Sequence, residues 1–145
     1  GVGLRLEGPD ADRGRLYLQT PMTARRYRNL PELSAQRMRE GWYDTGDIVR
    51  RDGDGFHYFV GRADDMMVVG GENVYPAEVE KILESHPAVA QAAVVPAPDD
   101  IKGEKPVAFV VLRAGVGASE AELKAHALAN GPAYAHPRRV VTLEA

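Results

Sequence analysis

The chain has 145 residues, of which 44% are hydrophobic, and a formal net charge of −3 at pH 7. This length and composition suit one ordinary domain or two small ones with a packed core. The sequence contains no cysteine, which excludes disulfides, thiolate metal sites and a cysteine nucleophile. It also fits the reducing cytoplasm, where we expect the protein to reside.

The distribution of apolar and basic residues limits the possible partners. No run approaches the roughly 18 consecutive apolar residues that cross a membrane. The sequence also lacks the basic stripe with interleaved aromatic residues that is typical of nucleic-acid binders. We therefore expect neither a membrane span nor a nucleic-acid partner.

The charge is divided unevenly along the chain. Residues 1–62 hold eleven arginines and nine acidic residues, whereas residues 63–145 hold seven basic and twelve acidic residues. This shift indicates a boundary near residue 63. The first residue is glycine and nothing resembles a removed signal peptide, so we expect the chain to be a piece of a longer protein.

The first part of the chain predicts two hairpins and a short helix. Residues 4–6 and 15–18 alternate polar and apolar side chains, which predicts an antiparallel pair joined by a loop around residues 8–10. A proline opens a helix over residues 31–39, and we expect its arginines to face water. The second hairpin pairs residues 46–51 with 56–60.

The turn of that second hairpin carries two Asp-Gly pairs at residues 52–55, the strongest short-range hairpin signal. Antiparallel pairing then brings Asp47 and Arg62 toward the same end of the sheet. Two interpretations stay open from the residues alone. The two side chains form a surface salt bridge of small energetic value, or they serve a binding site.

The stretch over residues 61–76 has an unusual order of side chains. A charged cluster is followed by the apolar run 66–69, the pair Gly70-Gly71, and Pro76, which opens an amphipathic helix over residues 77–85. The glycines either form a tight turn at positive φ or let a ligand approach the backbone closely. The apolar run predicts a short buried strand.

The remainder predicts a small α+β sandwich. Residues 89–95 and 107–112 predict strands, the second buried on both faces, with a polar loop over 96–105 between them. Ser119 and Glu122 predict a capping box for a helix through Asn130, and Val140-Val141 a last strand. The second part therefore has the order β-turn-α-β-β-α-β, with both helices on one side of the sheet.

Three motifs together resemble the adenylate-forming enzymes. They are Gly-Trp-Tyr-Asp-Thr-Gly-Asp at residues 41–47, Gly-Arg-Ala-Asp-Asp at 61–65, and Gly-Gly-Glu-Asn-Val-Tyr-Pro-Ala-Glu-Val-Glu at 70–80. Their order and spacing are specific, although each motif alone is not. The third is most similar to its form in fatty-acyl and aryl-acid CoA ligases. The resemblance implies a β-rich subdomain over residues 1–63, followed by a mobile C-terminal domain over 64–145.

The resemblance also implies roles for individual residues. Asp47 matches the aspartate that binds both ribose hydroxyls of ATP, and Arg62 matches an arginine that contacts the nucleotide. Asp64 matches the hinge between the large and the mobile domain. Gly70 and Gly71 match the turn that lines the passage for the pantetheine arm of CoA.

Other family features are missing from these residues. The phosphate-binding loop, the acyl pocket and the metal-binding glutamate have no match, so we expect no metal site here. The catalytic lysine of the family lies beyond a Pro-Lys/Arg stretch that residues 137–139 resemble, past Ala145. Lys105 and Lys124 are not substitutes, because one lies in a predicted loop and the other on the outer face of a helix. We therefore expect no catalytic residue in this chain and no activity from it alone.

As a member of this family, the intact protein would convert an acid, ATP and CoA to acyl-CoA, AMP and pyrophosphate with Mg²⁺, through an acyl-adenylate. Its partners would be a carboxylic-acid substrate, CoA and an N-terminal ligase domain. Two alternatives stay open: transfer to a carrier-protein phosphopantetheine, and a noncatalytic interaction module.

Overall fold

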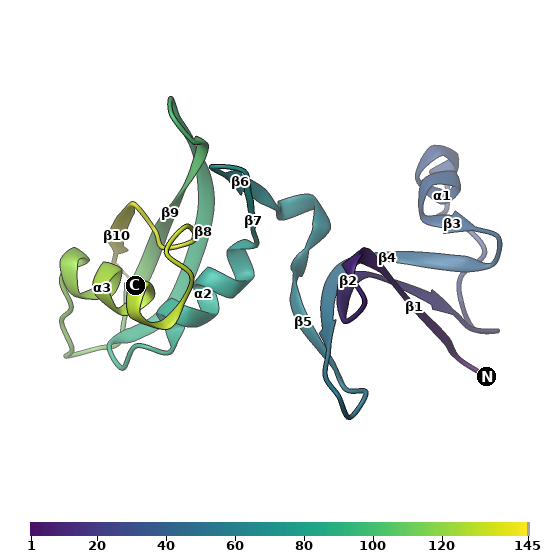
Figure 1. Ribbon diagram of the computed structural model, residues 1–145, viewed down its shortest axis with the longest axis horizontal. Helices are drawn as coiled ribbons and strands as arrows, with labels where there is room; N and C mark the ends of the chain where they lie inside the picture. Colours follow the sequence, from purple (N-terminus) through teal and green to yellow (C-terminus); the bar gives the residue numbers. More distant parts are fainter. Residues whose placement is uncertain (145) are drawn as a thin grey trace. The chain divides into compact units, whose positions relative to one another are not determined.

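The computed structural model describes residues 1–144 and shows two compact units, which divide after Asp64. Figure 1 follows the chain from the β-rich first unit, in purple and blue, to the mixed second unit, in green and yellow. Across the described residues, no helix is both long and apolar enough to cross a membrane. The fold class is α+β, as the sequence predicts.

The first unit is one antiparallel sheet of five strands with a single short α-helix. The sheet has the order β1-β2-β4-β3, and β5 also pairs with β4. Strand β4 is long enough to pair with β3 near its start and with β5 near its end. The elements are β1 Gly3–Asp10, β2 Arg13–Gln19, α1 Pro31–Arg37, β3 Met38–Arg39, β4 Trp42–Arg51, β5 His57–Arg62 and the 3-10 turn η1 Ala63–Asp65.

Two boundaries in this unit differ from the sequence prediction. Strand β1 continues through Gly8-Pro9-Asp10, so the expected loop is only the turn between Asp10 and Arg13, and the register shifts between Glu7 and Asp10. Proline is tolerated because β1 lies at the edge of the sheet. The helix α1 ends at Arg37 rather than residue 39, since Met38 has already turned to extended backbone.

The β4–β5 hairpin confirms the prediction from the Asp-Gly pairs. The Asp52 carboxylate accepts hydrogen bonds from the backbone N–H groups of Asp54 and Phe56, at 3.0 and 2.9 Å. Gly55 has a φ of +87°, which glycine adopts readily. The turn aligns β4 and β5, and a register shift between Ile48 and Val49 places Asp47 opposite Arg62.

The second unit is a second five-stranded sheet with both helices packed on one face. Strand β9 pairs antiparallel with β8 and β6 and parallel with β10, and β7 extends the sheet from β6. The elements are β6 Met67–Val69, β7 Glu72–Val74, α2 Pro76–Glu84, β8 Val89–Asp99, β9 Gly103–Leu112, α3 Glu120–Asn130 and β10 Arg139–Leu143.

The predicted polar loop over residues 96–105 is wrong, because β8 extends to Asp99 and β9 begins at Gly103. Pro96 and Pro98 are accommodated because β8 is an edge strand that pairs only with β9. Burial of β9 on both faces is also wrong. Its fully buried side chains alternate along the strand, at Pro106, Ala108 and Val110, so only one face enters the core.

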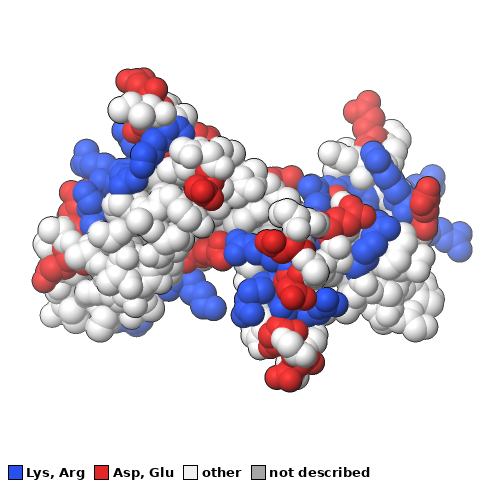
Figure 2. All heavy atoms as spheres, in the orientation of Figure 1, with Lys and Arg blue, Asp and Glu red and all other residues white. Residues whose placement is uncertain are grey.

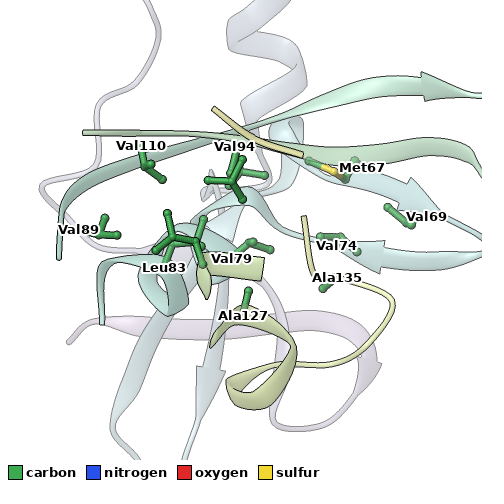
Figure 3. Close-up of a cluster of buried hydrophobic side chains, with 13 residues drawn as sticks. Met67, Val69, Val74, Val79, Leu83, Val89, Val94, Val110, Ala127 and Ala135 are labelled. Atoms are coloured by element: carbon green, nitrogen blue, oxygen red, sulfur yellow. The ribbon is translucent and has the colours of Figure 1, made fainter. Parts of the chain in front are cut away.

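The core of the second unit forms where α2 and α3 cover the sheet (Figure 3). Helix α2 buries Val79 and Leu83, four residues apart on one face, and α3 contributes Leu123. The capping box that starts α3 is present, with the Ser119 N–H donating to Glu122 Oε2 at 2.7 Å and the Glu122 N–H to Ser119 Oγ at 3.3 Å. The remaining members are Met67, Val69, Val74, Val89, Val94, Ala108, Val110, Ala127, Ala135 and Val140.

Candidate functional site

The Thr45-Gly46-Asp47 segment of β4 forms a locally fixed bend. Thr45 Oγ1 donates to the carbonyl of Leu16 at 3.0 Å and accepts from the Asp47 N–H at 3.0 Å. Gly46 has a φ of +74°. A Cβ there would lie 2.5 Å from Arg37 Nη1 and 2.7 Å from Arg62 Nη2. The positive φ favours glycine at this position, and any other side chain would also displace the two guanidinium groups that pack against it.

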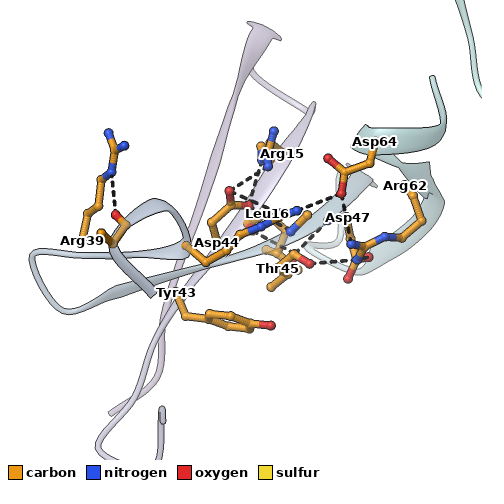
Figure 4. Close-up of polar contacts among 12 residues, drawn as sticks. Arg15, Leu16, Arg39, Tyr43, Asp44, Thr45, Asp47, Arg62 and Asp64 are labelled. Carbon is orange, nitrogen blue, oxygen red and sulfur yellow. Dashed lines mark hydrogen bonds and ion pairs between the residues drawn. The ribbon is translucent and has the colours of Figure 1, made fainter. Parts of the chain in front are cut away.

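Asp47 and Arg62 meet at the end of the β4–β5 hairpin, as the sequence predicts (Figure 4). Arg62 Nη1 donates to Asp47 Oδ1 at 2.7 Å and to the Thr45 carbonyl at 2.8 Å. The side chain of Arg62 is 41% exposed and that of Asp47 is 32% exposed. Hydrogen bonds to and from backbone atoms thus fix the bend. The Asp47 carboxylate and the Arg62 guanidinium stay accessible to a polar ligand.

Asp44 lies on β4 with Asp47. The sequence analysis did not predict that this charged residue has a structural role. It is buried, at 7% exposure. Arg15 contacts both carboxylate oxygens, with Nε 2.7 Å from Oδ1 and Nη2 2.7 Å from Oδ2. Oδ1 also accepts a hydrogen bond from the Gly46 N–H at 2.9 Å. Burial disfavours the ionised form, yet the hydrogen bonds from Arg15 and Gly46 hold the pKa of Asp44 below its ordinary value.

Arg37 contradicts the expectation that the arginines of α1 face water, because its side chain is only 12% exposed. It donates from Nη2 to Asp64 Oδ2 at 2.8 Å, and its Nη1 lies 3.5 Å from Asp44 Oδ2. The hydrogen bond from Arg37 lowers the pKa of Asp64. No sequence pattern marks the contact of Arg37 with Asp64, which lies 27 residues away along the chain, or that of Asp44 with Arg15, which lies 29 residues away.

Gly70 and Gly71 belong to the second unit and form the two-residue turn between β6 and β7. Their φ values are +59° and +88°, which a primed hairpin turn requires at both central positions. A Cβ at Gly71 would meet no atom within 4 Å among the described residues. The turn conformation alone therefore explains both glycines, and the short strand β7 that follows was not predicted.

The chemistry available at Asp47 and Arg62 is recognition rather than covalent catalysis. An ionised carboxylate accepts hydrogen bonds from neighbouring hydroxyls, and a guanidinium donates to oxygen without changing its protonation state. Among residues 1–144, no group of three His, Asp or Glu side chains could hold a metal ion.

Comparison with known proteins shows which family this chain belongs to. Residues 78–145 match the family model of the AMP-binding enzyme C-terminal domain. A medium/long-chain-fatty-acid–CoA ligase of Mycobacterium tuberculosis is 41% identical over 138 residues, covering 90% of this chain and 24% of the ligase. This chain belongs to the adenylate-forming enzymes. Within that family the chain spans about a quarter of the length of the curated relatives that it matches.

Other adenylate-forming enzymes match it nearly as well. A fatty acid–[acyl-carrier-protein] ligase of Streptomyces coeruleorubidus is 44% identical over 117 residues, covering 81% of this chain and 22% of that enzyme. The solved structure of o-succinylbenzoate CoA synthetase from Bacillus subtilis, in complex with its acyl-adenylate intermediate, has a TM-score of 0.90 and 33% identity. The match covers 98% of this chain and 30% of the synthetase chain.

Proposed function

We propose that this chain is the C-terminal portion of an AMP-forming carboxylate–CoA ligase. The intact protein would join an acid to CoA at the expense of ATP, through an acyl-adenylate, with AMP and pyrophosphate as products. The observation that carries the proposal is the ion pair of Asp47 with Arg62, 2.7 Å long and partly exposed beside a fixed bend. Carboxylate–CoA ligases among the relatives support the reaction class.

In this proposal Asp47 accepts hydrogen bonds from the two ribose hydroxyls of the nucleotide. A carboxylate can accept both, and hydrogen bonds to an ionised group are about twice as strong as neutral ones. Arg62 holds one oxygen of Asp47 and contacts the nucleotide as well. The bend at Gly46 fixes the backbone of Asp47 before the nucleotide arrives, so little conformational entropy is lost on binding.

The second unit would serve the thioester half-reaction. We propose residues 1–63 as the last subdomain of the ligase body and 64–145 as its mobile domain, with Asp64 as the hinge. Gly70 and Gly71 would line the passage for the pantetheine arm, since a backbone without side chains lets a thin chain approach closely. Two half-reactions with different residues at one site require such a rotation.

We propose CoA as the acceptor rather than a carrier protein. The first relatives are CoA ligases, although one relative is an acyl-carrier-protein ligase. A noncatalytic interaction module finds no support in these relatives. Mg²⁺ would accompany ATP in the intact cytoplasmic enzyme, with ligands from outside the described residues. The 145 residues alone would not form an adenylate, because they carry no phosphate-binding loop.

The test is Asp47→Ala in the full-length protein. Loss of two charge-assisted hydrogen bonds should raise the KM for ATP about tenfold or more, with little change in melting temperature. The matched control is Asp12→Ala, which removes the exposed 3.1 Å pair with Arg51 in the same unit and should leave the KM unchanged. A fall in melting temperature with unchanged ATP kinetics would reduce Asp47 to a structural salt bridge.

A further inference from the structure

Two arginines share the carboxylate of Asp64. Arg37 Nη2 lies 2.8 Å from Asp64 Oδ2, and Arg62 Nη2 lies 3.5 Å from the same oxygen. Arg62 directs its other terminal nitrogen, Nη1, to Asp47 at 2.7 Å. Asp47 and Asp64 thus contact one guanidinium through different nitrogens, and the shorter contact goes to Asp47.

Arg37 is fixed more firmly than Arg62. Its side chain is 12% exposed, against 41% for Arg62, and its Nη1 lies 3.5 Å from the buried carboxylate of Asp44. Both guanidinium groups pack against Gly46, where an added Cβ would clash with each. Among the described residues, Nη1 of Arg37 makes the longer ion pair with Asp44 but no hydrogen bond, whereas Nη2 donates to Asp64. Because the side chain is already buried, it loses little further entropy by keeping its hydrogen bond to Asp64.

The charges in this cluster balance one another. It contains three arginines and three aspartates joined by consecutive ion pairs, in the order Arg15, Asp44, Arg37, Asp64, Arg62 and Asp47. Removing Arg37 would leave Asp64 with Arg62 as its nearest cation and the cluster with one excess negative charge. Both effects oppose an anionic nucleotide, because Arg62 would turn toward Asp64 and the excess charge would repel phosphate.

We propose that Arg37 is a positioning residue of the nucleotide site. By neutralising Asp64, it prevents that carboxylate from drawing Arg62 away from Asp47. This inference rests on the proposed function, in which Asp47 and Arg62 bind the nucleotide. It gives a role to α1, which the sequence motifs do not include.

The test is a double-mutant cycle on the full-length protein, with the dissociation constant for ATP measured by titration calorimetry. Arg37→Met should weaken ATP binding about fivefold, the scale of one partly screened ion pair. Adding Asp64→Asn should restore the affinity to within about twofold, because the competing carboxylate is gone. Arg37→Lys, which keeps the positive charge, should retain most of the affinity. A merely structural role of Arg37 would not be rescued by Asp64→Asn.

Each outcome separates the two proposals. If the unaltered protein does not bind ATP, the proposed function fails. If it binds ATP but Arg37→Met does not weaken binding, or if Asp64→Asn brings no recovery, the positioning role is wrong and the proposed function stands. Arg51→Met, in an exposed ion pair with Asp12, is the matched control. Should Arg37→Met fail to fold, Arg37→Gln retains a donor and the same rescue is required of it.

Discussion

At the scale of single residues, Asp44 shows how a buried charge supports an exposed one. Its carboxylate accepts three short hydrogen bonds, two from Arg15 and one from the Gly46 N–H. Removing one partner of a buried ion pair leaves the other charge buried without an opposite charge beside it, which destabilises the folded protein. Because Arg15 keeps 30% of its side chain exposed, water relieves part of that cost. We expect Asp44→Asn to lower the free energy of unfolding by about 2 kcal/mol at pH 7.

This loss should depend on pH in a defined direction. The pKa of Asp44 in the folded chain lies below its ordinary value of 3.8, so ionised Asp44 contributes stability that is fully present above pH 3.8. The contribution disappears as the pH falls through the lower folded pKa. Urea unfolding at a series of pH values should therefore show the difference between the two proteins shrinking only below about pH 4. A difference independent of pH would contradict the role of the ionised carboxylate.

At the scale of elements, the β6–β7 turn allows a test of whether Gly71 serves only the turn conformation or also the proposed thioester half-reaction. Gly71 has a φ of +88° and open space around its Cβ position, so Gly71→Leu costs backbone strain of about 1 kcal/mol or more without a clash inside the unit. In the full-length protein we expect this substitution to leave ATP–pyrophosphate exchange nearly intact and to block acyl-CoA formation. In the proposed function, a leucine would fill the passage for the pantetheine arm, which only the second half-reaction uses.

Gly115 offers the matched control for this turn. It has a φ of +74°, and its Cβ position has no atom of residues 1–144 within 4 Å. It lies in the same unit between β9 and α3. Gly115→Leu should cost similar stability and lower both half-reactions equally, through loss of folded enzyme. If Gly71→Leu behaves in the same way, Gly71 is only a turn glycine and the evidence for CoA at this turn is lost.

At the scale of the whole molecule, the proposed function assigns recognition of the ribose to the described residues and binding of the triphosphate to other parts of the full-length protein. No group of acidic side chains among residues 1–144 could hold a metal ion, and the sequence carries no phosphate-binding loop. The 145-residue chain by itself should release no pyrophosphate with a panel of fatty and aryl acids. The full-length protein under the same conditions is the control. Turnover by the chain at about 1 per second or faster, as ordinary enzymes reach, would refute this expectation.

Local signals in the sequence determined much of this protein. The Asp-Gly pairs at residues 52–55 set the register of the β4–β5 hairpin next to the turn, and a one-residue register shift between Ile48 and Val49 then places Asp47 opposite Arg62. The spacing of Val79 and Leu83 defined the buried face of α2, and the Ser119–Glu122 box fixed the start of α3. These features depend on neighbours within a few residues along the chain, so the sequence is sufficient to predict them.

Only the tertiary structure decided which strands lie at edges and which arginines are buried. Strands β1 and β8 run through prolines because each pairs on one side only, and a sequence does not state which strands lack a second neighbour. Arg37 is buried where Asp64, 27 residues away along the chain, and Asp44 on β4 both contact its guanidinium. Such ion pairs have no period or spacing, since they arise only when the sheet brings their strands together.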